Sequence, residues 1–144
     1  MRTKRIIPLC IALTIILCGF QCNNSTKNLA IASDAIAHAL ANAQTASKQA
    51  VTQGVISAQD DAEFEQHLVK VSQAGMVLND GIRANESATT LSAKVNSFLD
   101  AFNALQNQGL AGIKNPNTKL TLATIINGAE TSVAIIAAAV GGGK

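Results

Sequence analysis

Two histidines, each preceded by a carboxylate four residues earlier, are the side chains in this sequence best suited to metal binding or acid–base chemistry. Asp34 precedes His38 and Glu63 precedes His67, so on a helix each pair would share one face. If the chain folds back near Gly54, the helical rise brings the two histidines to about 7–8 Å apart along the axis. A metal or catalytic centre needs further converging groups, and the Glu-x-x-His motifs of helical-bundle metal centres are absent. We therefore expect two solvated surface pairs and no metal ligand, with a small ligand-binding bundle as an alternative.

Other chemical motifs are also missing from the sequence. The acidic run Asp60–Glu65 lacks the alternating oxygen ligands and the central glycine of a calcium-binding loop, and the start of a helix accounts for its charge. No Gly-x-Ser-x-Gly elbow, Walker glycine loop or dinucleotide-binding glycine pattern occurs. We accordingly predict a protein that is not an enzyme, with no catalytic or cofactor-binding residues.

The first 22 residues have the order of charge and hydropathy that the secretion machinery recognises. Arg2, Lys4 and Arg5 precede an apolar run from Ile6 to Phe20. The length of this run lies between that of a signal-peptide core, about 7–15 residues, and that of a membrane-spanning helix, about 20 residues. Residues 1–22 are therefore predicted to be a signal peptide or an N-terminal membrane anchor, and residues 23–144 an extracytoplasmic domain.

Cys22 offers a further fate for this segment, because bacterial lipoproteins are cut before a cysteine that then carries lipid. Phe20 and Gln21 depart from the residues that usually precede such a cysteine. An uncleaved anchor, lipidation of Cys22 and cleavage with secretion all remain open, in that order of preference, and each exports the rest of the chain. The partner that this segment predicts is a membrane, contacted through residues 1–22.

Charge and cysteine usage separate the first 22 residues from the rest. The chain has 11 Lys and Arg, 9 Asp and Glu, and a formal net charge of +2. Three of the basic residues precede the apolar run, which leaves eight basic against nine acidic residues after Cys22. A nearly neutral domain has no basic field that would bind nucleic acid. All three cysteines lie within the first 22 residues, so the domain must be held by packing and not by disulfides.

Apolar residues recur at alternating spacings of three and four in four stretches, which predicts helices over about 28–53, 58–84, 88–108 and 116–140. Gly75 is expected to mark a close helix contact, and Phe64, Phe98 and Phe102 to fill the thickest layer of the core. The predicted buried stripes are Leu29, Ala32, Ile36, Ala39, Ala43, Ala46 and Ala50; Phe64, Leu68, Val71, Gly75, Leu78 and Ile82; Leu91, Val95, Phe98, Phe102 and Leu105; and Leu122, Ile126, Ala129, Val133, Ile136 and Val140.

Capping residues mark the ends of these predicted helices. Gly54 stands where a left-handed C-cap is wanted after the first helix. Ser57 and Asp60 have the spacing of a capping box at the start of the second helix. Asn115 and Pro116 fit an N-cap followed by proline at the first helical position.

Gly109 and Gly112 are expected to end the third helix, so all the connections are short. Short connections favour antiparallel neighbours. The predicted fold class is all-α, an antiparallel up-down-up-down four-helix bundle that follows an N-terminal signal or anchor helix.

The stretch Leu120–Val140 contains a single charged residue, Glu130, and is nearly long enough to cross a bilayer. An acid at the centre of a spanning helix costs about 2.5–3.5 kcal/mol on insertion scales, and the many alanines contribute little to insertion. Burial in the bundle is the favoured prediction, and membrane insertion or contact in an oligomer is the alternative.

These features favour a membrane-tethered or lipid-anchored bacterial envelope protein that acts as a non-enzymatic helical scaffold or protein-interaction module. The motivation is an export segment joined to a core-forming domain that carries no reactive constellation. Its expected partners are the membrane and another envelope protein, with no nucleic acid. The alternative is a membrane-active protein of the lysis or pore type, in which Leu120–Val140 inserts.

Overall fold

The computed structural model describes residues 24–84 and 86–141, and in this part of the chain every regular element is a helix. Some of these helices follow one another so closely that they form four helical segments, which confirms the predicted all-helical class. Residues 1–22, including Cys22, lie outside the described residues. The helices are α2 (Asn24–Thr52), α3 (Ala58–Arg83), α4 (Ala88–Ala104), the π-helical turn η2 (Leu105–Gly109), α5 (Leu110–Gly112), α6 (Pro116–Asn127) and α7 (Glu130–Gly141).

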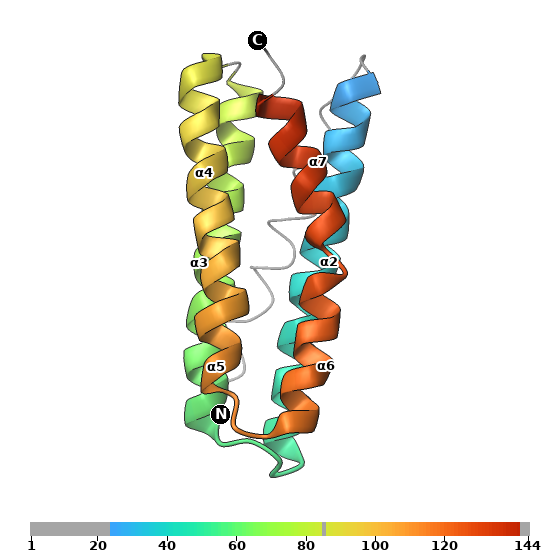
Figure 1. Ribbon diagram of the computed structural model, residues 1–144, viewed down its shortest axis with the longest axis vertical. Helices are drawn as coiled ribbons and strands as arrows, with labels where there is room; N and C mark the ends of the chain where they lie inside the picture. The colour runs from blue at the N-terminus through green and yellow to red at the C-terminus, as the bar shows by residue number, and fades with distance from the viewer. Residues whose placement is uncertain (1–23, 85, 142–144) are drawn as a thin grey trace, which may run out of the picture.

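The helical segments pack around one core, with each segment against two neighbours (Figure 1). α2 contacts α3 on one side and α6 and α7 on the other, while α4 contacts α3 and α7. In Figure 1 the first turns of α2 and the last turn of α7 lie at the upper end, and α5 and the start of α6 lie at the lower end. The N-terminal end of α2 and the C-terminal end of α7 therefore share one end of the molecule.

The predicted capping residues all have the expected geometry. Gly54 adopts a φ of 69° just after α2 ends, the left-handed conformation that glycine tolerates best. At the start of α3, the Asp60 amide donates to Ser57 Oγ at 3.0 Å and the Ser57 amide donates to Asp60 Oδ2 at 3.4 Å. At the start of α6, the Thr118 amide donates to Asn115 Oδ1 at 3.0 Å. Local sequence alone therefore defines these three helix ends.

The buried stripe of α2 differs from the predicted one in its second half. Leu40 and Ser47 are buried, whereas the predicted Ala39 and Ala46 are only partly buried. Two successive steps of four residues between positions 32 and 40 move the stripe by one residue, because a helix of 3.6 residues per turn drifts from a strict alternation of three and four. Ser47 was overlooked because it is polar.

The aromatic layer lies between α3 and α4 as predicted. Phe64, Phe98 and Phe102 are buried, and the ring centroids of Phe98 and Phe102 are 6.3 Å apart. A Cβ placed on Gly75 would lie 3.6 Å from Phe98 Cε2. This is an ordinary van der Waals distance, so Gly75 faces Phe98 of α4 with room for a methyl group, and the prediction of a contact close enough to require glycine stays a prediction.

The prediction that Gly109 helps to end the third helix is wrong. The helix passes through η2 and continues to Gly112, and Gly109 is buried inside η2. A Cβ on Gly109 would lie 3.1 Å from Leu105 Cδ1 and 3.3 Å from His67 Cβ. Glycine therefore serves close packing against α3 at this position. A π-helical turn adds a residue to a helix without ending it, which a stripe of apolar residues does not reveal.

The predicted fourth helix, 116–140, is interrupted, since α6 ends at Asn127 and α7 begins at Glu130. At the break the Ala129 amide donates to the carbonyl of Ile126 at 2.9 Å, three residues back, as in a tighter 3₁₀ turn. Both helices nevertheless present one continuous stripe to the core. Its buried members are Leu122, Ile126, Ala129, Val133 and Ile136.

Candidate functional site

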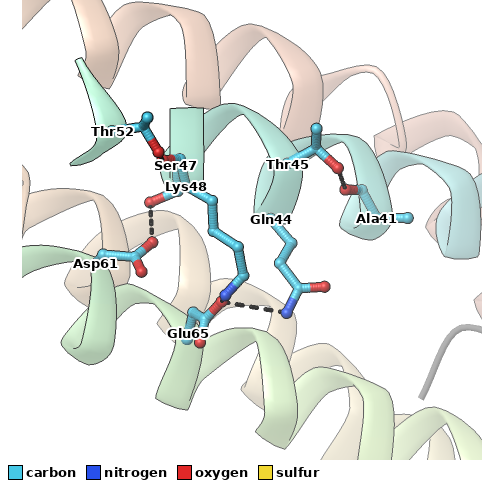
Figure 2. A network of polar contacts seen from close by, with 8 residues as sticks. All are labelled: Ala41, Gln44, Thr45, Ser47, Lys48, Thr52, Asp61 and Glu65. Carbon is cyan, nitrogen blue, oxygen red and sulfur yellow. Dashed lines mark hydrogen bonds and ion pairs between the residues drawn. The ribbon is translucent and has the colours of Figure 1, made fainter. Parts of the chain in front are cut away.

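The densest group of polar contacts between helices joins α2 to α3 and is shown in Figure 2. Ser47, which is 0% exposed, donates from Oγ to Asp61 Oδ1 at 2.6 Å. A short hydrogen bond to a carboxylate is among the stronger polar contacts in proteins. This bond ties the last turns of α2 to the first turns of α3.

Glu65 lies one turn further along α3 and receives two side chains from α2 (Figure 2). Gln44 Nε2 donates to Glu65 Oε1 at 3.2 Å, and Lys48 Nζ pairs with the same oxygen. Gln44, Ser47 and Lys48 are spaced by three and four residues, so they project from one side of α2. We name this set, together with Asp61 and Glu65, the α2–α3 polar seam.

Asp60, the first residue of the acidic run, also has polar partners. Its carboxylate closes the capping box with Ser57 and lies 3.8 Å from Lys114 Nζ, in the connection between α5 and α6. The helix start accounts for Asp60, as predicted, but the sequence reasoning missed the cross-helix partners of Asp61 and Glu65. The signal that would have found them is the polar spacing on α2, which becomes meaningful only once the facing helix is known.

The first histidine pair lies where it was predicted. His38 Nε2 is 3.5 Å from Asp34 Oδ2 on α2, and the His38 side chain is 74% exposed. An exposed pair of this kind contributes little to stability. Among the residues that the structure describes, no third His, Cys, Asp or Glu joins this pair as a possible metal ligand.

The second histidine differs from the prediction of a solvated pair. His67 is half-buried on α3, and its Nδ1 is buried with no hydrogen-bond partner. Glu63 instead accepts a hydrogen bond from Gln59 at 3.1 Å. Burial, and secondly the positive charge of Lys70, lowers the pKa of His67 below its ordinary value of 6.5. His67 is half-buried because it packs against Gly109. The spacing of apolar residues does not reveal this contact.

Gln106 links η2 to the break between α6 and α7. Its Nε2 donates to Asn127 Oδ1 at 3.2 Å and to Glu130 Oε1 at 2.8 Å. Asn127 and Glu130 lie on either side of the interruption. The one acid in Leu120–Val140 therefore has a hydrogen-bond partner within the bundle.

No three or more His, Cys, Asp or Glu side chains come together as a metal site within residues 24–84 and 86–141. Two groups of polar side chains instead connect neighbouring helices: the α2–α3 polar seam, and Gln106 with Asn127 and Glu130. These contacts fix the register of α2 against α3 and of η2 against α6 and α7.

The outer surface of α6 and α7 has a different character. The stretch Pro116–Ala139 is the one described helical stretch long and apolar enough to cross a membrane, and 28% of its most apolar window is buried in the bundle. Leu120 is 68% exposed and Ile135 is 41% exposed. Length and composition of this kind also occur in core helices of proteins outside membranes, so the stretch indicates an apolar surface and no more.

No protein-family model, curated protein or solved structure matches this chain.

Proposed function

We propose that this protein is a non-enzymatic helical scaffold or protein-interaction module of the bacterial cell envelope. Residues 1–22, or a lipid on Cys22, tether it to the membrane. The observation that supports the scaffold role best is the use of the α2–α3 polar seam. Asp61 and Glu65, which could have served chemistry, are paired with Ser47 and Lys48 across the helix contact. Such pairing favours one rigid helix register over reactivity.

The proposal includes an antiparallel up-down-up-down bundle that follows an N-terminal anchor helix. Short connections and the packing of each segment against two neighbours support this topology. α3 has 26 residues, and a helix of that length spans about 39 Å. The connection between α2 and α3 would then lie about that far from the tethered end of α2.

Contact with an envelope protein is proposed through the outer side of α3. Val69 and Val77 are exposed there, eight residues apart, which places them about 80° apart around the helix axis and about 12 Å apart along it. The near balance of eight basic and nine acidic residues after Cys22 supports a protein partner over nucleic acid.

In-cell photocrosslinking tests this proposal. A photoreactive side chain at Val77 of the full chain should give a specific adduct with another envelope protein, recovered from the membrane fraction. The same side chain at Thr121, which is exposed on α6, is the matched control. Recovery of only the uncrosslinked protein from Val77 in intact cells would contradict the interaction role, and mass spectrometry of the mature N-terminus tests the tether separately.

A membrane-active protein in which Leu120–Val140 inserts is the second candidate, favoured by the composition of Pro116–Ala139. Insertion would have to separate Glu130 from Gln106, which donates to it at 2.8 Å. It would also place the break around Gly128 and an ionisable acid in the bilayer centre, where both are disfavoured. Residues 23–144 should partition into detergent under this candidate and stay in buffer under the scaffold proposal.

A further inference from the structure

The second half of α7 is apolar on all sides, although only one side faces the core. From Val133 to Gly141 no residue carries a polar side chain. Val133 and Ile136 are buried, whereas the other side exposes Ala134, Ile135, Ala138 and Ala139. A helix that is apolar all round is normally covered on every side, by protein or by lipid. The exposed side of α7 therefore lacks a cover within the described chain.

The position of this surface indicates what covers it. The last turn of α7 and the first turns of α2 lie at the same end of the molecule (Figure 1), and α2 and α7 pack against each other. Phe20, the last residue of the apolar run, precedes α2 by only a few residues. Three intervening residues can span at most about 11 Å. A membrane that holds residues 6–20 would thus lie next to the end of α7.

We propose that the exposed side of α7, formed by Ala134, Ile135, Ala138 and Ala139, rests in the interface of the lipid bilayer beside the N-terminal tether. This inference rests on the proposed tether. Alanine-rich surface alone binds lipid weakly. A tether to the same membrane makes the second contact intramolecular, at an effective concentration in the millimolar range, so a weak apolar contact becomes populated.

The positions of the charged residues in α6 and α7 are consistent with a lipid contact limited to the end of α7. Glu130, the acid of α7, lies eight residues before Ala138, which is about 12 Å along the helix, and it bonds Gln106 of the bundle. α6, nearer the lower end in Figure 1, exposes Lys119 and Thr121 on either side of Leu120. The bilayer contact therefore requires no charge to leave water.

The chain contains no tryptophan and no tyrosine, so one introduced tryptophan reports on its own surroundings. The full chain, purified from envelope membranes, is reconstituted in phosphatidylcholine vesicles with and without brominated acyl chains. Ile135→Trp should show blue-shifted emission and lose intensity in the brominated vesicles. Thr121→Trp, at an exposed position of α6, is the matched control and should keep its intensity and its red emission. Ala138→Trp repeats the test if the first variant loses its helical circular dichroism.

The outcomes separate this inference from the proposed function. If the protein floats with the vesicles and the tryptophan at position 135 is not quenched, the tether stands and the lipid contact of α7 is wrong. Emission that is blue-shifted but unquenched, together with crosslinked dimers, would overturn it in favour of a second copy covering α7. Quenching at both 135 and 121 would overturn it in favour of full insertion. Failure to float with vesicles would reject the tether and the inference together.

Discussion

Gly54 follows α2 and Gly75 lies within α3, and the two glycines occupy different backbone conformations. Gly54 has a φ of 69° and would place a Cβ in open space, so its conformation alone demands glycine. Gly75 has ordinary helical backbone, and a Cβ there would make van der Waals contact with Phe98 at 3.6 and 3.8 Å. Alanine substitutions at these two positions therefore test backbone strain and packing separately.

Gly54→Ala is expected to lower the free energy of unfolding by about 1 kcal/mol, because the left-handed cost for alanine exceeds the entropy that the unfolded chain loses. Urea denaturation followed by far-UV circular dichroism measures the change. An unaltered midpoint would mean that the turn after α2 relaxes into another conformation.

Gly75→Ala is expected to raise the free energy of unfolding by up to about 1 kcal/mol, since alanine is the better helix former and the Phe98 ring leaves room for the methyl group. The same denaturation experiment applies. Destabilisation would show that the contact between α3 and α4 has no room for the methyl group.

His67 should make stability depend on pH. Its pKa in the folded protein is lowered from 6.5, first by burial and then by Lys70, so the unfolded chain binds the proton first as pH falls. The contribution of His67 is complete above the unfolded pKa and is lost as pH falls through 6.5 toward the folded pKa.

His67→Gln is therefore expected to flatten the dependence of unfolding free energy on pH between about 7 and 5. Urea midpoints across this range measure it. His38→Gln, which removes the exposed histidine, is the matched control and should follow the parent protein. Equal slopes in both variants would place the pH dependence in other groups. A ligand-induced stabilisation lost only in His67→Gln would favour the ligand-binding alternative.

The contact between α2 and α3 depends on a buried serine that no apolar pattern could supply. Ser47→Ala leaves the half-buried Asp61 carboxylate without its 2.6 Å donor. Because water can still reach this acceptor, we expect the free energy of unfolding in urea to fall by about 1 kcal/mol. Thr45→Ala removes an exposed hydroxyl that bonds only the Ala41 carbonyl of its own helix and should change stability by less than about 0.5 kcal/mol. Equal losses of stability in the two variants would show that the hydrogen bond between Ser47 and Asp61 does not stabilise the α2–α3 polar seam.

Helix identity and most ends could be predicted because they depend on local chemistry. Gly54, Ser57 and Asn115 act through their own backbone neighbours, so their spacing in the sequence was sufficient. The π-helical turn at Leu105–Gly109 could not be predicted, because Gly109 packs closely against His67 on another helix. The same holds for Leu40 and Ser47 on α2, whose burial depends on how the facing helices are placed. The burial of these residues depends on packing between segments that are distant in the sequence, and local patterns do not reveal that packing.

Charged residues are distributed unevenly over the bundle, and this distribution supports both proposed contacts. α3 carries Asp60, Asp61, Glu63, Glu65, Lys70, Asp80 and Arg83, whereas α6 and α7 together carry only Lys119 and Glu130. Partner contact is proposed on the charged side and lipid contact on the nearly uncharged side. A tethered bundle with such a division would present the same face to its partner in every copy.

The bundle itself must be stable without the membrane if these assignments hold. Buried residues from every segment share one core, including Phe64, Phe98, Leu105, Leu122 and Ile126, so unfolding one segment exposes the others. We expect residues 23–144 alone to remain in dilute buffer, to give a helical circular dichroism spectrum and to unfold in one cooperative transition, with a free energy within the usual range of about 5–15 kcal/mol. Coincident urea transitions by circular dichroism and by amide proton dispersion in NMR check this. Aggregation that only detergent reverses would instead mean that α6 and α7 need lipid to fold.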